Sequence, residues 1–435
     1  MNKKITFFII LLFINNCSLD TKSGFWTKSE KLTKETKIQT KKIFVEKKKL
    51  DKEFNSSIRI NLKGNYLNNI FLNNLTNNNN LVNYKGPVKK ISRFKFKKIN
   101  HFTNLTPELF FTEDKSLVFY DNIGSILKFD LNSNLNWKSN IYKKSEKKLE
   151  PILSFAGNNK VIIVADNFGK YYSIDLKTGK LIWSKKNTDP FNSQIKIFGN
   201  TFFVVDYSNT LRCFSITDGS EIWKFKSTVP LIRSQQKTSI VLSKNLVIFI
   251  NSLGELTALN NKSGDLIWQT PTQLNKISGN SFMRMNSDLV LDKNFLFFSN
   301  NDNDFFSIDL NSGLINWKQK INSSLRPTVI NNLVFTITME GYFAIIDSKS
   351  GNIIRITNIF DKIKKSKRNK IKPTGFIVSR DKIYLSLDNG RLLVINLSNG
   401  KTTEVVKIAN SKISRPHIHN NNMYLIKSNA ILKVN

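Results

Sequence analysis

A short pattern recurs along most of this chain: an apolar run, a tight turn with Gly or Asn at a fixed place, and a second apolar run. Gly and Asn adopt a positive φ more readily than other residues, as a tight hairpin requires. Consecutive copies lie 38 to 49 residues apart. The eight turn residues are Gly124, Gly169, Asn209, Gly254, Asn303, Gly341, Gly390 and Asn429. One copy cannot bury its apolar face alone, so the copies are expected to pack on one another.

A second turn follows the first in most copies and completes the layout of the unit. Its glycines are Gly179, Gly219, Gly264, Gly313, Gly351 and Gly400, and the tryptophans that follow these turns are Trp183, Trp223, Trp268 and Trp317, with Trp137 at the equivalent place in the first unit. A unit of this length with several short strands predicts an all-β fold, an eight-bladed β-propeller of four-stranded antiparallel blades. Because each Trp occurs once per unit, we expect it to pack between blades.

The last unit lacks its final strand, because the chain ends at ILKVN, residues 431–435. A ring with an open edge there would expose unpaired backbone groups. The segment ISRFKFKKI at 91–99 alternates apolar and basic residues and belongs to no other unit. We therefore expect this amino-terminal strand to complete the last blade, within a propeller spanning residues 86–435.

The amino terminus has the layout of an export signal over residues 1–16. Lys3 and Lys4 precede an apolar run from Ile5 to Ile14, which is too short for a lasting membrane span. Cys17 follows directly, and this end resembles a bacterial lipoprotein signal, in which the cysteine carries the lipid. The alternative is an ordinary export signal cut nearby, with Cys17 incidental. Either interpretation exports the chain from the cytoplasm.

Residues 17–85 are rich in Lys and Asn and include the run NNLTNNNN at 73–80. Such a segment has few apolar residues to offset its ordering entropy, so we expect a flexible tether. The whole chain has 67 Lys and Arg against 32 Asp and Glu, a formal net charge of +35. That charge indicates either an anionic surface as partner or a compositional bias towards Lys and Asn, and an exported chain makes nucleic acid a weak candidate.

The repeat resembles the quinoprotein-type (PQQ-like) propeller repeat. Together with the lipoprotein-type signal and the polar tether, it resembles the BamB family of outer-membrane protein assembly lipoproteins. This resemblance implies a non-catalytic scaffold without a cofactor, anchored on the periplasmic face of the outer membrane. It also implies docking on the periplasmic region of BamA, the central protein of the barrel-assembly machinery. A separate hypothesis is that blade edges receive unfolded outer-membrane protein clients by β-augmentation.

The resemblance places the docking residues in two loops between blades, at about 229–236 and 281–289. In VPLIRSQQ, Ile232 and Arg233 match a Leu-Arg pair of the family's motif and Leu231 precedes them, whereas Ser234 and Gln235 depart from the Gly-Glu that follows it. In RMNSDLVLD, Asp288 is the one clear acid of an Asp-x-Asp pair. The alternatives are a surface cation with a local partner for Arg233 and a turn residue for Asp288.

The rival class is a quinone-dependent dehydrogenase, which shares the fold. Such enzymes need a quinone, a cation held by oxygen ligands and a catalytic acid in the central funnel, and they resemble one another in a pair of adjacent cysteines. This chain has only Cys17 and Cys213, and Cys213 lies in an apolar strand as a core residue would. No Ser-His-Asp constellation or phosphate-binding Gly loop occurs in the sequence.

Three further groups of residues have plain structural interpretations. Acids recur at the strand end before the second turn, where capping of the turn is favoured over metal binding; they are Asp130, Asp175, Asp309 and Asp347. His417 and His419 form an i, i+2 pair without a nearby third ligand, so we expect no metal site. The basic run 361–372 is either a solvated loop or a contact with an anionic surface.

Overall fold

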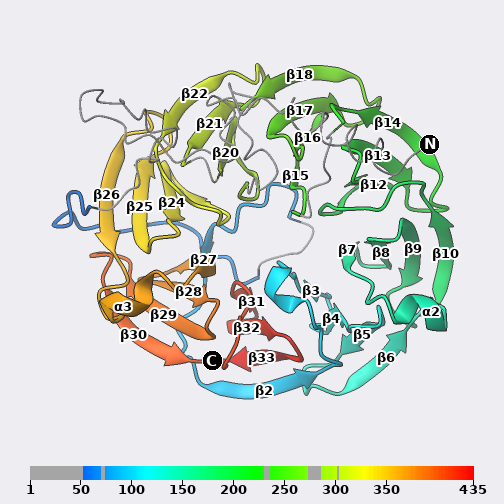
Figure 1. The fold of residues 1–435 in the computed structure, drawn as a ribbon, viewed down its shortest axis with the longest axis horizontal. Helices are drawn as coiled ribbons and strands as arrows, with labels where there is room; N and C mark the ends of the chain where they lie inside the picture. Colours follow the sequence, from blue (N-terminus) through cyan, green and yellow to red (C-terminus); the bar gives the residue numbers. More distant parts are fainter. Residues whose placement is uncertain (1–51, 70–73, 230–235, 273–285, 301–302) are drawn as a thin grey trace, which may run out of the picture. The chain divides into compact units, whose positions relative to one another are not determined.

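The computed structural model describes residues 52–69, 74–229, 236–272, 286–300 and 303–435. The chain divides into two compact units, 1–46 and 47–435, and all described residues belong to the second. Eight sheets follow one another around a ring in this unit, with each sheet built from neighbouring segments of the chain (Figure 1). The predicted eight-bladed propeller of four-stranded antiparallel blades is confirmed.

The first four blades take their strands in chain order from the axis outwards. They are blade 1, β3 (Phe110–Phe111), β4 (Leu117–Tyr120), β5 (Ile126–Phe129) and β6 (Leu135–Ser139); blade 2, β7 (Leu153–Gly157), β8 (Val161–Asp166), β9 (Lys170–Asp175) and β10 (Leu181–Lys186); blade 3, β11 (Lys196–Phe198), β12 (Thr201–Val205), β13 (Thr210–Ser215) and β14 (Glu221–Lys226); and blade 4, β15 (Ile240–Leu242), β16 (Leu246–Ile250), β17 (Glu255–Asn260) and β18 (Leu266–Pro271).

The remaining blades follow the same plan, with two strands added from the amino-terminal part of the chain. They are blade 5, β19 (Val290–Asp292), β20 (Phe295–Ser299), β21 (Phe305–Asp309) and β22 (Ile315–Gln319); blade 6, β23 (Thr328–Ile330), β24 (Leu333–Ile337), β25 (Tyr342–Asp347) and β26 (Ile353–Asn358); blade 7, β27 (Pro373–Ser379), β28 (Lys382–Leu387), β29 (Arg391–Asn396) and β30 (Thr402–Lys407), with β1 (Leu81–Val82); and blade 8, β31 (His417–His419), β32 (Asn422–Lys427) and β33 (Ala430–Val434), with β2 (Lys90–Lys95). Three short helices lie in connections within the described ranges: η1 (Phe102–Asn104), α2 (Lys144–Lys147) and α3 (Lys365–Arg368).

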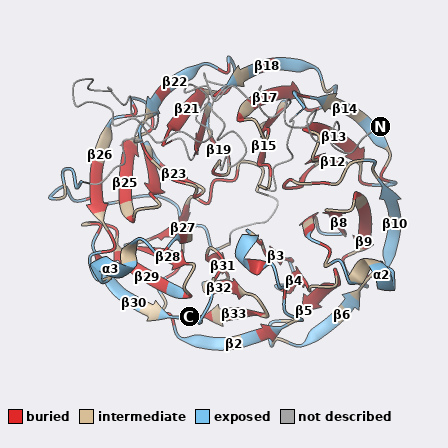
Figure 2. Ribbon diagram, in the orientation of Figure 1, coloured by how far each residue is buried: buried red, intermediate tan, exposed pale blue. Residues whose placement is uncertain are grey.

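We letter the strands of each blade A to D from the axis outwards. Because neighbouring strands are antiparallel, the A–B and C–D turns of all blades lie on one face of the ring, the turn face. The B–C turns and the D–A connections between blades lie on the opposite face, the connector face. Figure 2 shows that strands A to C are largely buried, while the D strands at the rim are largely exposed, apart from β26 of blade 6, which is mostly buried.

The amino-terminal strand closes the ring as predicted. β2 pairs antiparallel with β33, placing Arg93 opposite Leu432 and Phe94 opposite Ile431. Phe94 is buried and its ring lies 5.8 Å from that of Phe129 in blade 1, so the closing strand also packs across the junction. The last blade is thereby completed by residues from the other end of the propeller, which removes a free edge.

The first turns adopt the predicted backbone conformation in seven of the eight copies. Gly124, for example, has φ of 74° and Asn303 has φ of 62°. Asn429 is the exception: the prediction of a positive φ there is wrong, and the positive values in blade 8 fall on Asn420 and Asn421, in the A–B turn. The connection between β32 and β33 is a two-residue turn there, with Lys427 opposite Ala430.

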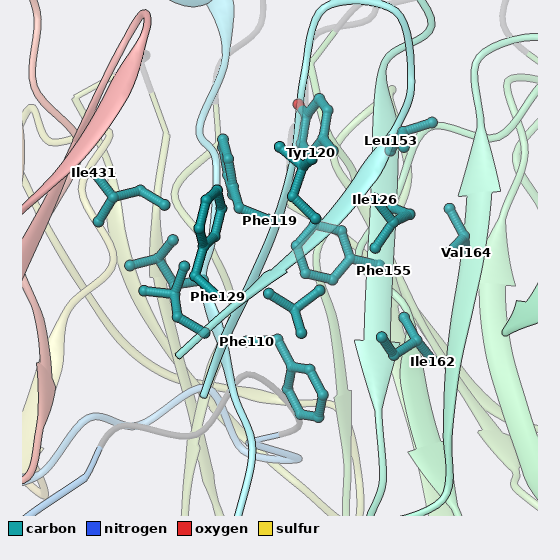
Figure 3. Packing of buried hydrophobic residues seen from close by; sticks show 14 of the residues in the cluster. Phe110, Phe119, Tyr120, Ile126, Phe129, Leu153, Phe155, Ile162, Val164 and Ile431 are labelled. Carbon is teal, nitrogen blue, oxygen red and sulfur yellow. The ribbon is translucent and has the colours of Figure 1, made fainter. Parts of the chain in front are cut away.

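The tryptophans lie between blades, as predicted. The Trp183 indole Nε1 donates to the carbonyl oxygen of Ile216 at 2.8 Å, and the Trp268 indole donates to Leu310 at 2.9 Å. Each of these rings covers a glycine turn of the following blade, such as Gly219 or Gly313. Apolar side chains fill the remaining space between sheets, as in the cluster around Phe119, shown in Figure 3.

The amino-terminal arm, residues 52–85, differs from the flexible tether expected over 17–85. Its described residues lie against the propeller, and in Figure 1 the blue trace runs from the outside of β26 into the middle of the ring. The Phe54 backbone pairs with Ile356 on the outer edge of blade 6, with N···O distances of 3.0 and 2.9 Å. β1 pairs in parallel with β27 of blade 7. The arm is ordered by backbone groups that blade edges leave unpaired, which no local sequence pattern reveals.

Candidate functional site at the connector-face mouth of the channel

The structure describes only part of the predicted docking region. Leu231, Ile232 and Arg233 lie outside the described residues, as do Cys17 and the signal over 1–16. Asp288 is described, directly before strand A of blade 5, where the D–A connection reaches the axis. It lies at the connector-face mouth of the central channel, beside charged residues from three other blades.

The mouth holds a network of ion pairs centred on Arg326, which precedes strand A of blade 6. The Arg326 guanidinium contacts the Asp288 carboxylate at 2.5 Å and the Glu108 carboxylate, from blade 1, at 2.6 Å. Arg415, which precedes strand A of blade 8, contacts the same Glu108 carboxylate at 3.0 Å. Asp288 therefore has an internal partner, although 32% of its side chain remains exposed.

The surroundings at the mouth favour the ionised form of Glu108 and the neutral form of the two buried lysines. Burial pushes the pKa of Glu108 upwards, but the charges of Arg326 and Arg415 outweigh it and hold that pKa well below its usual range. Burial lowers the pKa of Lys196 to about 7, and the Glu108 carboxylate opposes the change. Lys237, from the end of the 227–239 connection, also has a lowered pKa because of burial.

Cations exceed acids among the described residues of this mouth. Arg326, Arg415, Lys196 and Lys237 are the basic residues there, with Lys196 only partly protonated at neutral pH because its pKa is about 7, while Glu108 and Asp288 are the two acids that face them. Such an arrangement repels cationic partners and favours anionic ones at close range.

The amino-terminal arm fills the channel immediately beneath this network. The Lys196 amine donates to the side-chain oxygen of Asn77 at 2.6 Å, and Arg415 approaches the side-chain oxygen of Asn79 at 3.5 Å. Asn77, Asn78 and Asn79 are each at most 3% exposed. The arm thus supports the mouth from the inside of the ring.

The recurring acids cap turns, as predicted. The Asp175 carboxylate accepts from the backbone N–H of Thr178 at 2.7 Å, and that of Asp347 accepts from Ser350 at 2.7 Å. Asp130 and Asp309 make the same kind of contact. These hydrogen bonds lower the pKa of the four carboxyl groups. Their oxygens are used within the turns of separate blades, so they do not converge.

The histidine pair has a structural setting. His417 and His419 are buried in strand A of blade 8, and the His419 ring stacks on Phe111 of blade 1, with centroids 4.4 Å apart. Burial lowers the pKa of His417 to about 3 and that of His419 to about 4. Within the described ranges, no three His, Cys, Asp or Glu residues are grouped so as to hold a metal ion.

A quinone with a cation held by carboxylates does not fit the described channel residues. Asn74–Asn80 of the arm lie on the axis, and Asn77 there contacts strands A of blades 3 and 4 and the start of blade 5. The acids of the mouth are engaged by arginines.

In the described part of the chain, no helix is long and apolar enough to cross a membrane.

Sequence comparison identifies the family. The family of the outer membrane protein assembly factor BamB matches residues 123–357, which is more than half of the chain. This chain belongs to the BamB family. The BamB proteins of Moranella endobia and Yersinia pestis are each 20% identical to it, in alignments of 259 and 265 residues that cover 59% and 55% of this chain. The chain spans less than two thirds of these relatives, 64% and 62% of their lengths.

Solved structures agree on the fold. BamB from Moraxella catarrhalis superposes with a TM-score of 0.65 at 15% identity, covering 80% of this chain and all of that one. A quinohemoprotein alcohol dehydrogenase from Comamonas testosteroni superposes with a TM-score of 0.60 at 8% identity, covering 85% of this chain and 78% of that one. The fold alone therefore does not separate BamB from an enzyme.

Sequence reasoning missed most residues of this site. Glu108, Arg326 and Arg415 each lie one to two residues before an inner strand, a position that the repeat pattern leaves unconstrained. Arg326 and Arg415 share one local signal, since each precedes a proline that starts an inner segment, in LRPTV and SRPHI. That shared Arg-Pro pair is a sequence feature that could have pointed to these two arginines.

Proposed function

We propose that this chain is a non-catalytic scaffold of outer-membrane protein assembly that docks through its connector face on the periplasmic region of BamA. Membership of the BamB family carries the proposal. The connector face supports it, because the two loops expected to dock leave the ring there, beside the charged mouth. The proposal places the chain in the periplasm, attached to the outer membrane through a lipid on Cys17.

The docking role is assigned to Leu231, Ile232 and Arg233 in the first loop and to Asp288 at the end of the second. Asp288 is two-thirds buried against Arg326, so it acts mainly by fixing the end of its loop. The first three residues supply apolar contact and a charge to the partner, a combination typical of interface hot spots.

A binding measurement with purified BamA periplasmic region tests the docking proposal. Arg233→Glu should weaken binding at least tenfold, and Leu231→Ser with Ile232→Ser should do the same. Lys262→Glu is the matched control, because Lys262 is an exposed cation in the C–D turn of blade 4, on the opposite, turn face. If wild type binds the BamA periplasmic region and the loop variants bind it with equal affinity, the docking site lies elsewhere on the chain. If wild type does not bind the BamA periplasmic region, the docking proposal is rejected.

Lipid attachment is tested separately. Cys17→Ser should release the exported chain from the membrane fraction, and mass spectrometry of the wild-type amino terminus should find acyl groups on Cys17. A chain that stays with the membrane after Cys17→Ser would contradict the anchor without affecting the docking proposal.

A second part of the proposal concerns clients at the outer edges of the blades. Pairs of exposed apolar residues begin the D strands of blades 2, 4 and 5: Leu181 with Ile182, Leu266 with Ile267, and Leu314 with Ile315. At blade 6 the equivalent edge, β26, already pairs with an extended segment of the chain itself through Phe54. This contact supports capture of extended client strands at the other edges by β-augmentation.

A fluorescent peptide with the alternating sequence of a barrel strand tests client binding. Replacing Leu181, Ile182, Leu266 and Ile267 with Ser should weaken its binding several-fold. Leu131→Ser with Leu149→Ser is the control, since both residues are exposed and apolar but lie outside the D strands. A loss of the same size in the control would assign the binding to general surface hydrophobicity.

The rival dehydrogenase is tested by adding pyrroloquinoline quinone and calcium to the purified chain. We expect no cofactor absorbance on the protein and no dye reduction with alcohols. Saturable quinone binding accompanied by dye reduction would replace the scaffold proposal.

A further inference from the structure

The inner edges of the blades present unpaired backbone groups to the channel, and the arm satisfies them blade by blade. The backbone N–H of Leu242 in blade 4 donates to the carbonyl oxygen of Leu75 at 2.8 Å, and that of Leu291 in blade 5 donates to Thr76 at 2.9 Å. In blade 7, Leu81 lies opposite Val378 in a parallel pair. Successive arm residues therefore meet successive blades.

Asn77 lies at the centre of these contacts. Its Nδ2 has acceptors from three blades, its Oδ1 accepts from Lys196, and its side chain is 1% exposed. The acceptors around Nδ2 are Gln194 Oε1 at 3.1 Å, Ser239 Oγ at 3.2 Å, Ile240 O at 3.1 Å and Leu289 O at 2.9 Å. Its φ of 59° is a conformation that Asn adopts more readily than other non-glycine residues. Both the hydrogen bonds of the side-chain amide and the positive φ therefore favour Asn at position 77.

The side chain of Asn78 makes hydrogen bonds to blade 6 like those of a neighbouring strand. Its Nδ2 donates to the Val329 carbonyl oxygen at 2.9 Å, and its Oδ1 accepts from the Val329 N–H at 3.1 Å. A side-chain amide has the donor and acceptor of a peptide group, so it closes this edge as a neighbouring strand would. An Asp at either position would lose the donor and bring a negative charge to buried carbonyl oxygens.

We propose that the channel is a peptide-binding site that recognises an Asn-Asn pair in a looped segment, and that residues 74–80 are its resident ligand, held in cis and exchangeable. The segment enters past Leu242, at the turn face, reaches the connector-face mouth at Asn77–Asn79, and returns along β27. It leaves the ring by the side on which it entered, so no threading prevents its exchange. This inference does not depend on docking to BamA.

Residues 74–80, as part of the same chain, compete for the channel at a much higher effective concentration than a free peptide. A tethered ligand acts at an effective concentration in the millimolar range. A micromolar peptide of residues 74–82, NLTNNNNLV, should therefore not bind the wild-type chain detectably. It should bind once the cis copy is weakened.

Fluorescence anisotropy with this labelled peptide and the full chain tests the proposal. The Asn77→Ala with Asn78→Ala variant should bind it at least tenfold more tightly than wild type, and at least tenfold more tightly than it binds the peptide NLTDDNNLV. Asn61→Ala with Asn65→Ala, at exposed positions of the same arm, should behave as wild type. No binding to the folded double variant, or equal binding of both peptides, would overturn the proposal.

Hydrogen exchange in the wild-type chain tests, without any variant, whether the arm segment occupies the channel. The amides of Leu242, Leu291 and Val329 have acceptors on the arm alone among the contacts of the described residues. They should exchange at least a hundredfold more slowly than unprotected amides. Exchange at unprotected rates at these three positions would show that the segment does not occupy the channel, and would overturn the proposal even if the variants fail to fold.

Discussion

Arg355 in blade 6 donates from its guanidinium to the carbonyl oxygen of Leu397 in blade 7, at 2.9 Å. Four other junctions make the same contact with an indole, as Trp317 does to Ser348. Arg355 holds the Trp position of its unit, four residues after Gly351. Because it has further donors, it also reaches the Ile58 carbonyl oxygen in the arm, at 2.9 Å. One substitution in the repeat thus connects the junction to the arm.

Arg355→Ala should lower the free energy of unfolding by about 2–4 kcal/mol, since it leaves buried carbonyl oxygens without a donor. Burial lowers the pKa of Arg355 to about 10, which shows how far the group lies from solvent. Arg355→Trp should lose less, because an indole restores the contact to Leu397. Denaturant unfolding measures both, with Arg391→Ala as an exposed control. Equal losses for Ala and Trp would contradict the role of the shared carbonyl contact.

Gly264→Ala should lower the free energy of unfolding more than Gly199→Ala does. The difference between the two losses measures the cost of a steric contact with a tryptophan. Both glycines have positive φ, 79° and 60°, so both substitutions carry a backbone cost of about 1 kcal/mol. A Cβ at Gly264 would lie 2.7 Å from the Trp223 ring, whereas a Cβ at Gly199 meets no atom within 4 Å. We expect a further loss of about 1–3 kcal/mol for Gly264→Ala. Thermal or denaturant unfolding of the pair provides the comparison, and equal losses would place the whole cost in the backbone.

Sequence patterns predicted the parts of the fold that each unit determines locally. The turn glycines, the capping acids such as Asp175 and the junction tryptophans follow from residue type and spacing. The closing strand β2 was predicted because a ring needs its last edge paired. The arm was not, because NNLTNNNN has no apolar periodicity, and its order comes from unpaired groups on inner strands 117 to 251 residues away. The charged residues of the mouth were not predicted from sequence patterns for the same reason, because they come together only when the ring closes.

Stability should rise with pH between about pH 7 and pH 10 because of Lys196. Its pKa is about 7 in the folded chain, lowered by burial, while the unfolded chain has the ordinary value near 10.5. The unfolded state therefore binds more protons in that window, so raising the pH favours folding, by up to about 1.4 kcal/mol per pH unit for one group. In Lys196→Met the slope of unfolding free energy against pH should be smaller by that amount. Parallel slopes for the two chains would show that Lys196 titrates normally.

Glu108 should contribute a dependence of the same sign as Lys196, but in the acid range. Its folded pKa is well below the ordinary value because the charges of Arg326 and Arg415 outweigh burial. A lowered carboxyl pKa contributes stability that is complete above the unfolded pKa, about 4.3, and is lost as the pH falls towards the folded value.

The wild-type chain should therefore exceed Glu108→Gln in unfolding free energy at pH 6, by about 3–5 kcal/mol, because Arg415 loses its carboxylate partner and Arg326 keeps only Asp288. The gap should narrow steadily below pH 4, because acid removes the same charge from the wild type. Glu113→Gln is the control, as Glu113 is exposed and close in sequence. Urea unfolding at a series of pH values measures the gap. A gap that is constant from pH 6 to pH 2 would mean that Glu108 stabilises the mouth through packing and not through its charge.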